Sequence, residues 1–266
     1  MNPFKSVKRI VFKVGTSTLT HENGKTNIHR MAKLSQVLSD LHNSGLEVVL
    51  VTSGAIGVGV GKLGLPGRPT DTPGRQAAAT VGQCELMFMY DKLFGEFGQT
   101  IGQLLVTRSD IENEERRNNL INTFEKLFEY GAIPIVNEND SVAVEEIVYG
   151  DNDSLSANVA KLIGADALVI LSDIDGLFSA NPRQDKNAEL IPFVERITED
   201  ILALAASAGT SRGTGGMITK LQAAKLATEA GIDTVVMNGS DPEAIYELLE
   251  GGVLGTFFKK QSNIKD

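Results

Sequence analysis

The sequence predicts an α/β fold, a three-layer α/β/α sandwich with a mostly parallel central sheet. Short runs of β-branched and aliphatic residues alternate with helical patterns along the whole chain. These runs are almost continuously apolar, as strands are when helices cover both faces of a sheet. The chain has 266 residues with 42% hydrophobic content, which is enough to bury a large core. We therefore expect a single domain over residues 1–266.

The first half of the chain predicts four strands separated by helices. Residues 27–44 place apolar side chains at helical spacing, with Asn27 as the N-cap and Gly45 as the stop. A glycine-rich turn is expected after the second strand, and residues 64–74, rich in Pro and Gly, predict a long loop. The expected strands are 9–14, 47–52, 101–107 and 132–136, and the other expected helices lie near 74–95 and 113–129.

The second half repeats the alternation. Residues 142–149 suggest part of a small antiparallel hairpin before the next helix begins. Two strands, 167–171 and 234–237, are apolar runs of the kind that parallel sheets bury, and a short strand is expected near 253–258. The expected helices lie near 153–163, 199–207, 216–230 and 242–250.

Composition excludes several classes of function. A net charge of −9 and a pI near 5.0 argue against a nucleic-acid partner, which needs a basic surface. No run approaches the roughly 20 apolar residues of a membrane span, and the N-terminus has no signal-like apolar segment. Cys84 is the only cysteine, which fits a reducing cytoplasm, and we expect it to pack as a small apolar residue in a helix. Three scattered histidines give no zinc or iron ligand set, so any metal would be a hard cation held by oxygen atoms or phosphates.

The most informative segment is 136–153, where a strand runs into clustered carboxylates and amides. Asn137, Glu138, Asn139 and Asp140 form the first cluster, and Asp151, Asn152 and Asp153 form the second. Open α/β sheets bind ligands at the carboxyl ends of their strands. An amino acid has an ammonium group that Asp140 would pair and a carboxylate that amide and backbone donors would hold. The alternative is a solvated loop of Asx-turns.

Two segments of the first half have the chemistry of anion sites. Lys13 and Gly15 end the first strand, where glycine lets the backbone approach a ligand and hydroxyls follow. Ser53 and Gly54 lie at the turn between a strand and a helix, where free backbone N–H groups bind anions. The spacing is not that of the common P-loop. The alternative for Lys13 is an edge-strand lysine that points to solvent.

Two segments of the second half add further polar groups. Ser172 and Asp173 leave another parallel strand, at an edge where a nucleotide could rest. The glycine-rich run 213–216 leads into a helix that carries Lys220. A flexible loop and a solvated lysine are the alternatives. Two lysines at two such junctions suit a transferring phosphoryl group, whose charge must be neutralised while its partners are held in line.

Six segments taken in order resemble the amino acid kinase family: 13–17, 51–56, 136–140, 150–153, 172–177 and 213–220. The resemblance covers about residues 8–258. It implies a substrate lobe over about 1–160 and a nucleotide lobe over about 161–258. The pair 137–140 and 150–153 is similar to members that use ATP with Mg²⁺ to phosphorylate the γ-carboxylate of L-glutamate, the first step of proline biosynthesis.

The resemblance also implies residue roles, with no protein metal ligand among them. Lys13 and Lys220 would stabilise the transferring phosphoryl group, and Asp153 would orient the two lysines. The residues implied to hold glutamate are Ser53, Gly54, Asn137, Asp140 and Asn152. Those implied to contact ATP are Lys13, Ser172, Asp173, Thr214, Gly215, Gly216, Met217, Ile218, Thr219 and Lys220.

Further expectations follow from the same resemblance. They are a homo-oligomer (dimer or tetramer), inhibition by proline and channelling to glutamate-5-semialdehyde dehydrogenase. Longer members add a C-terminal RNA-binding-like domain, which we do not expect in this chain. Acetylglutamate, aspartate and carbamate kinases share the ATP half of the family, and a non-catalytic amino-acid sensor is the alternative of another class. Asp140 favours a substrate with an unmodified ammonium group, and retention of Lys13, Lys220 and Asp153 favours an enzyme.

Overall fold

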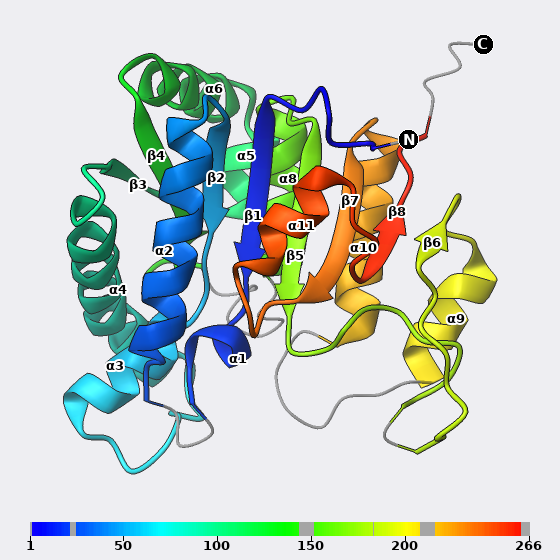
Figure 1. Ribbon diagram of the computed structural model, residues 1–266. Coiled ribbons are helices and arrows are strands. Elements are labelled where there is room, and N and C mark those ends of the chain that lie inside the picture. Colours follow the sequence, from blue (N-terminus) through cyan, green and yellow to red (C-terminus); the bar gives the residue numbers. More distant parts are fainter. Residues whose placement is uncertain (1, 22–24, 144–151, 183, 208–215, 262–266) are drawn as a thin grey trace.

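The computed structural model describes residues 2–21, 25–143, 152–182, 184–207 and 216–261. Within these residues one sheet of eight strands runs through the centre of the molecule, in the order β3-β4-β2-β1-β5-β7-β8-β6 (Figure 1). Neighbouring strands are parallel from β3 to β7, and the β7–β8 pair is antiparallel. The strands are β1 (Arg9–Val14), β2 (Glu47–Val51), β3 (Thr100–Val106), β4 (Ala132–Glu138), β5 (Ala167–Ser172), β6 (Phe193–Val194), β7 (Asp233–Asn238) and β8 (Thr256–Phe258).

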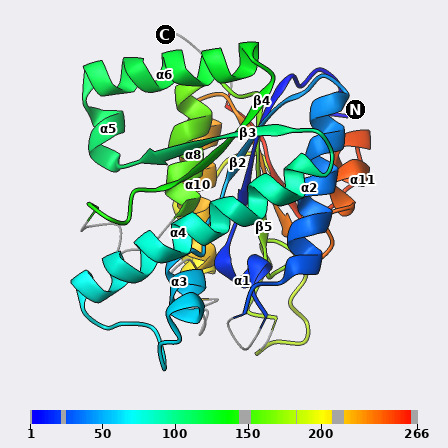
Figure 2. The same cartoon turned by 90° about the vertical axis from the view of Figure 1, so that its left-hand side faces the viewer.

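Helices cover both faces of the sheet, so the expected three-layer α/β/α architecture is confirmed. Seen along the sheet in Figure 2, α2 and α11 lie on one side and α6, α8 and α10 lie on the other. The described helices are α1 (Thr16–Leu19), α2 (Ile28–Asn43), α3 (Ala55–Leu63), α4 (Thr72–Gly95), α5 (Arg108–Glu112), α6 (Glu114–Glu129), α8 (Asn152–Leu162), α9 (Glu199–Ser207), α10 (Met217–Glu229) and α11 (Ala244–Glu250).

Among the described residues, two large apolar clusters form most of the core, one on each face of the sheet, and a small third cluster lies between α3 and α4. In β1, Ile10 and Phe12 belong to the cluster with α2, α4 and α11, whereas Val11 belongs to the cluster with α6, α8 and α10. Side chains alternate along a strand, so a strand buried on both faces must be apolar at successive positions. This requirement explains the continuous apolar runs in the sequence.

Most expected elements lie where the sequence predicts them, within a few residues. Asn27 caps α2 as expected, since its side chain accepts from the backbone N–H of Arg30. Ser53 and Gly54 form the expected turn between β2 and a helix, but the glycine-rich segment that follows is not a turn, because residues 55–63 form helix α3. The short elements α1, α5 and β6 were not expected. The suggested hairpin at 142–149 lies almost wholly outside the described residues, and Cys84 is exposed rather than packed.

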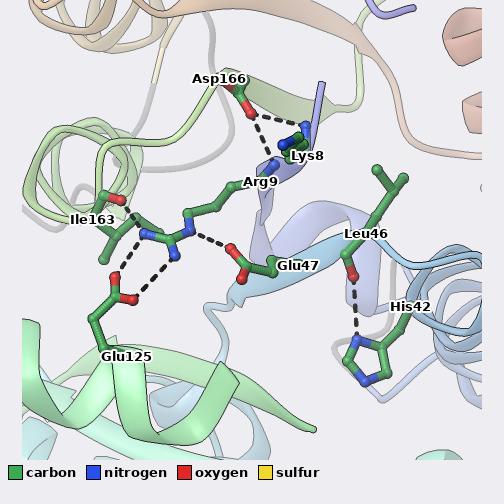
Figure 3. Close-up of polar contacts among 8 residues, drawn as sticks. All are labelled: Lys8, Arg9, His42, Leu46, Glu47, Glu125, Ile163 and Asp166. Atoms are coloured by element: carbon green, nitrogen blue, oxygen red, sulfur yellow. Dashed lines mark hydrogen bonds and ion pairs between the residues drawn. The ribbon is translucent and has the colours of Figure 1, made fainter. Parts of the chain in front are cut away.

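The two ends of the sheet have different chemistry. At the amino ends of β1 and β2, the Arg9 guanidinium bonds to Glu47, Glu125 and the Ile163 carbonyl (Figure 3). The carboxylate of Asp166 accepts from the backbone N–H groups of Lys8 and Arg9 in the same region. This network ties helices to the sheet. The candidate functional residues lie at the opposite, carboxyl ends of the strands.

Candidate active site

A buried carboxylate joins two lysines that are far apart in the sequence. Lys13 Nζ lies 2.5 Å from Asp153 Oδ1, and Lys220 Nζ lies 3.1 Å from Asp153 Oδ2. Asp153 is 0% exposed and each lysine is 6% exposed. The alternatives of a solvent-facing edge lysine and a solvated helix lysine are therefore wrong.

Three elements build this cluster. Lys13 lies near the end of β1, a central strand paired on both sides with β2 and β5. Asp153 lies in the first turn of α8, and Lys220 lies in the first turns of α10. Thr219 also donates its hydroxyl to Asp153 Oδ2 at 2.9 Å, which adds a second bond from α10. The carboxylate therefore fixes the start of both helices against the end of β1.

The electrostatics of the cluster favour its charged form. Burial alone would raise the pKa of Asp153, but the ammonium groups of Lys13 and Lys220 outweigh burial and hold that pKa well below its usual range. With Asp153 ionised, the cluster carries one net positive charge in a chain whose net charge is −9. A local positive charge at a sheet end is what an anionic phosphoryl group requires.

A cavity of about 430 Å³ opens beside this cluster. Its volume is within the range of pockets that hold small molecules. All five residues implied to hold an amino acid line it: Ser53, Gly54, Asn137, Asp140 and Asn152. Asn152 is the sequence neighbour of Asp153, so the cavity and the lysine cluster meet at the start of α8.

Amide side chains are locked together on the wall of the cavity. Asn152 Nδ2 donates to the Thr52 carbonyl at 2.5 Å and to Asn137 Oδ1 at 2.8 Å. Asn137 Oδ1 also accepts from the backbone N–H of Glu138 at 2.9 Å. These bonds join the ends of β2 and β4 to α8. Asn137 and Asn152 are thus part of a fixed network, whereas Asn139 accepts from the Ser141 hydroxyl in a local turn.

The start of α3 forms another part of the wall. Gly54 is its N-cap residue with φ of +102°, a conformation that glycine adopts without strain. Gly54 has no side chain that could cap this helix, so the first backbone N–H groups of α3 can face a bound anion. The helix continues through Val60 and Gly61, which also line the cavity.

The expected nucleotide residues are less fully described. Ser172 is buried at the end of β5 and donates its hydroxyl to Asp173 at 3.3 Å, while Asp173 is exposed. Gly216 caps α10 with extended backbone, and the Met217 side chain packs in the core, so only its backbone can face a ligand. Ile218 also packs against that core. Thr214 and Gly215 lie outside the described residues.

Several site residues escaped the sequence reasoning. Lys25 lines the cavity, as does Arg68 from the expected long loop 64–74. They lie there with Thr16, which belongs to the hydroxyl-bearing segment expected after the first strand. Gln83 and Tyr90 of α4 do not line the cavity but bond to residues of the network. Asn137 Nδ2 donates to Gln83 Oε1 at 2.7 Å, and the Tyr90 hydroxyl lies 2.8 Å from Thr52 Oγ1. Burial raises the pKa of the Tyr90 hydroxyl, which therefore stays neutral. Nothing in a local pattern distinguishes these two from other helix residues.

Comparison with known proteins agrees with this geometry. The profile of the amino acid kinase family matches residues 8–238, so the chain belongs to the amino acid kinase family. It is a kinase. Over 258 residues it is 53% identical to the glutamate 5-kinase of Clostridium perfringens, covering 96% of each chain. It is 54% identical over 254 residues to the glutamate 5-kinase of Clostridium tetani, covering 96% of this chain and 95% of that protein.

Solved structures show the same fold at much lower identity. Carbamate kinase from Giardia lamblia bound to AMP-PNP superposes with a TM-score of 0.68 at 16% identity, covering 96% of this chain and 99% of that one. Identity this low shows the fold alone. No helix among the described residues has the length and apolarity that a membrane crossing requires.

Proposed function

We propose that the protein is a glutamate 5-kinase, which transfers the γ-phosphoryl group of ATP to the γ-carboxylate of L-glutamate. The observation that carries this proposal is the junction at Asn152 and Asp153. Asn152 lines a cavity whose polar residues suit an amino acid, and the adjacent residue, Asp153, binds the two buried lysines. The similarity to curated glutamate 5-kinases over nearly the whole chain supports the same conclusion.

The cavity fits a free amino acid. The Asp140 carboxylate on its wall suits the ammonium group of the substrate. The uncapped start of α3 at Gly54, beside Ser53, suits the α-carboxylate. The γ-carboxylate would then extend toward Asn152 and the lysine cluster. An N-acetylated substrate would lose the charge that Asp140 pairs, which favours free glutamate over acetylglutamate.

The transfer needs no proton movement. The glutamate side chain has an ordinary pKa near 4.3, so it is already an anion at neutral pH. One of its oxygens forms a bond to the γ-phosphorus while the bond from that phosphorus to the β,γ-bridging oxygen breaks, and the negative charge leaves with ADP. Lys13 and Lys220 counter the charge that both anions bring together, and Asp153 holds the two lysines in place. A catalytic base is unnecessary.

We assign the nucleotide to the half of the sheet formed by β5 and β7 and to the start of α10. The phosphates would lie near Gly216 and Lys220, with Ser172 and Asp173 at the neighbouring strand end. In this assignment residues 1–160 form the substrate lobe and 161–258 the nucleotide lobe, both built on one continuous sheet.

Mg²⁺ belongs in this proposal with the substrate MgATP. Among the described residues no group of three or more His, Cys, Asp or Glu side chains could hold a metal ion. The buried carboxylate of Asp153 is engaged by Lys13, Lys220 and Thr219. These residues do not fit a dedicated metal cage, so the ion would be held by phosphate oxygens and water, as Mg²⁺ commonly is.

Regulation and assembly complete the proposal. Proline carries the ammonium and carboxylate groups of glutamate, so it would compete for Asp140 and the amide wall. We place the enzyme in the cytoplasm as a homo-oligomer that passes its labile product to glutamate-5-semialdehyde dehydrogenase. Inhibition that excess glutamate does not relieve would instead require a separate proline site.

The test is a hydroxylamine trap for the acyl phosphate, combined with measurement of ADP. The assay compares glutamate with N-acetylglutamate, aspartate and carbamate in the presence of MgATP. We expect a hydroxamate with glutamate alone at low substrate concentration. A hydroxamate with another acceptor and none above background with glutamate would contradict the proposal, and no ADP release with any of them would favour a sensor.

A further inference from the structure

We infer that Gln83 is a positioning residue that sets the hydrogen-bond polarity of the amino-acid cavity. Its side-chain amide, on helix α4, accepts from Asn137 Nδ2 at 2.7 Å. Asn137 and Asn152 line the cavity and Gln83 does not. Gln83 therefore acts on a ligand only through the asparagines. This inference rests on the proposed use of the cavity for a free amino acid.

The bonds of Asn137 require an acceptor at the position of Gln83. Asn137 Oδ1 already receives two donors, Asn152 Nδ2 and the backbone N–H of Glu138. Its Nδ2 must then point the other way, where only an acceptor can satisfy it. Gln83 Oε1 is that acceptor. Within the part of the chain that the structure describes, the opposite end of Gln83, Nε2, is a buried donor without a hydrogen-bond partner.

The consequence reaches the substrate through Asn152. Both hydrogens of Asn152 Nδ2 are used, one on the Thr52 carbonyl and one on Asn137 Oδ1. The remaining polar atom of Asn152 is Oδ1, an acceptor, and Asn152 lies on the same cavity wall as Asp140. An acceptor beside a carboxylate selects a cationic donor, the ammonium group of an amino acid. Gln83 thus helps to hold the cavity in the form that recognises an ammonium group.

Removing the Gln83 acceptor should weaken binding of the ammonium group and leave binding of the carboxylates unchanged. In Gln83→Met the Asn137 Nδ2 donor is left without an acceptor, and rotating to find one breaks the bond that fixes Asn152. We expect the glutamate KM to rise about tenfold, as for the loss of one buried hydrogen bond. The KM for ATP should stay close to wild type, and the melting temperature should fall by only a few degrees, because one buried donor loses its acceptor.

Glutarate makes the test specific, because it has both carboxylates of glutamate and lacks the ammonium group. Its inhibition constant against glutamate should be nearly the same in wild type and in Gln83→Met. Gln83→Glu keeps an acceptor toward Asn137 and should restore the glutamate KM to within about threefold of wild type. Gln76→Met, the same change two turns earlier on α4 at a partly buried residue away from the cavity wall, is the matched control and should have no effect.

Two results would overturn the inference. One is an equal loss of glutamate and glutarate binding in Gln83→Met, which would mean a general disturbance of the cavity. The other is an equal rise of KM in the Met and Glu variants. The proposed function is tested separately by wild-type turnover of glutamate. If wild type prefers another free amino acid, the same comparison is made with that substrate and its deaminated analogue.

Discussion

At the scale of single residues, the site depends on one carboxylate that forms ion pairs with two lysines. Asp153 is fully buried between Lys13 and Lys220. Burying a charge is unfavourable unless it is paired and hydrogen-bonded. Each member of the cluster is therefore needed by the others for stability, and in the proposed reaction the two lysines would also neutralise charge.

The lysines should affect the rate more than glutamate binding. Lys13→Ala or Lys220→Ala removes a charge that opposes the developing negative charge of the transition state. We expect kcat to fall a few hundred-fold or more, equivalent to roughly 3–4 kcal/mol, with a small change in the glutamate KM. Steady-state kinetics with both substrates varied checks this result. A large rise of the glutamate KM at unchanged kcat would contradict the assignment.

Asp153 should give the protein a pH-dependent stability. Its pKa is lowered in the folded state, so the unfolded state takes up its proton first as the pH falls. Its stabilising contribution is complete above the unfolded pKa of about 3.9 and is lost as the pH falls through the lower folded value. Asp153→Asn should be destabilised by roughly 3–5 kcal/mol at pH 7, because two buried ammonium groups lose their partner.

Denaturant unfolding between pH 7 and pH 3 measures this dependence. The difference in free energy of unfolding between wild type and Asp153→Asn should be flat at neutral pH and should shrink below about pH 4. A difference that grows on acidification would show that Asp153 is not held in its ionised form.

At the scale of elements, two crossing helices set the shape of the cavity. A Cβ atom built on Gly82 of α4 would lie 1.8 Å from the Ala55 carbonyl oxygen, and one on Gly59 of α3 would lie 1.8 Å from the Ala78 carbonyl oxygen. No side chain fits at such distances, so the two glycines allow the backbones to meet. This contact fixes the start of α3, where Gly54 and Ala55 line the cavity.

Gly82→Ala should therefore displace α3. We expect a destabilisation of about 1–3 kcal/mol, typical of overpacking, together with a higher glutamate KM and a nearly unchanged ATP KM. Thermal unfolding and kinetics measure the two effects. Gly95→Ala at the end of the same helix is the matched control, since a Cβ there meets nothing within 4 Å. Equal behaviour of the two variants would show that the close contact does not matter.

At the scale of the whole molecule, one sheet would hold the two proposed ligand sites side by side. The strands β4, β2 and β1 end at the cavity, whereas β1 and β5 end at the lysine cluster and the proposed nucleotide site. The chain carries a net charge of −9, and both proposed substrates are anions. Binding therefore depends on local donors and cations at this edge rather than on the overall field.

The two sites should be separable by ligand-induced stabilisation. A ligand at 100 times its Kd stabilises the folded state by about 2.7 kcal/mol, so glutamate and MgATP should each raise the melting temperature of the wild type. In Asp140→Asn the shift produced by glutamate should shrink strongly, because the ammonium group loses its ionic partner, while the shift produced by MgATP should persist. Loss of both shifts would contradict the division into two lobes.

The sequence by itself determined the fold class, the order of the long elements and the polar clusters at the strand ends. These are local properties: continuous apolar runs mark strands buried on both faces, and parallel strands bring their carboxyl ends to one edge. Parallel strand ends therefore place Ser53 and Gly54 at the same edge as Asn137 and Asp140, and the resemblance to the amino acid kinase family implies the full set with Asn152; all five line one cavity.

Only the tertiary structure decided which residues support that edge. Residues 55–63 contain three glycines and read locally as a turn, yet they form α3 because close packing on α4 overrides the low helix propensity of glycine. Gln83 lies 54 positions from Asn137, and nothing in the sequence pointed to their contact. Asp153 lies 67 positions from Lys220, and only the family resemblance implied that contact. Contacts between residues so far apart in the sequence depend on how helices pack on a sheet, so no local sequence pattern predicts them.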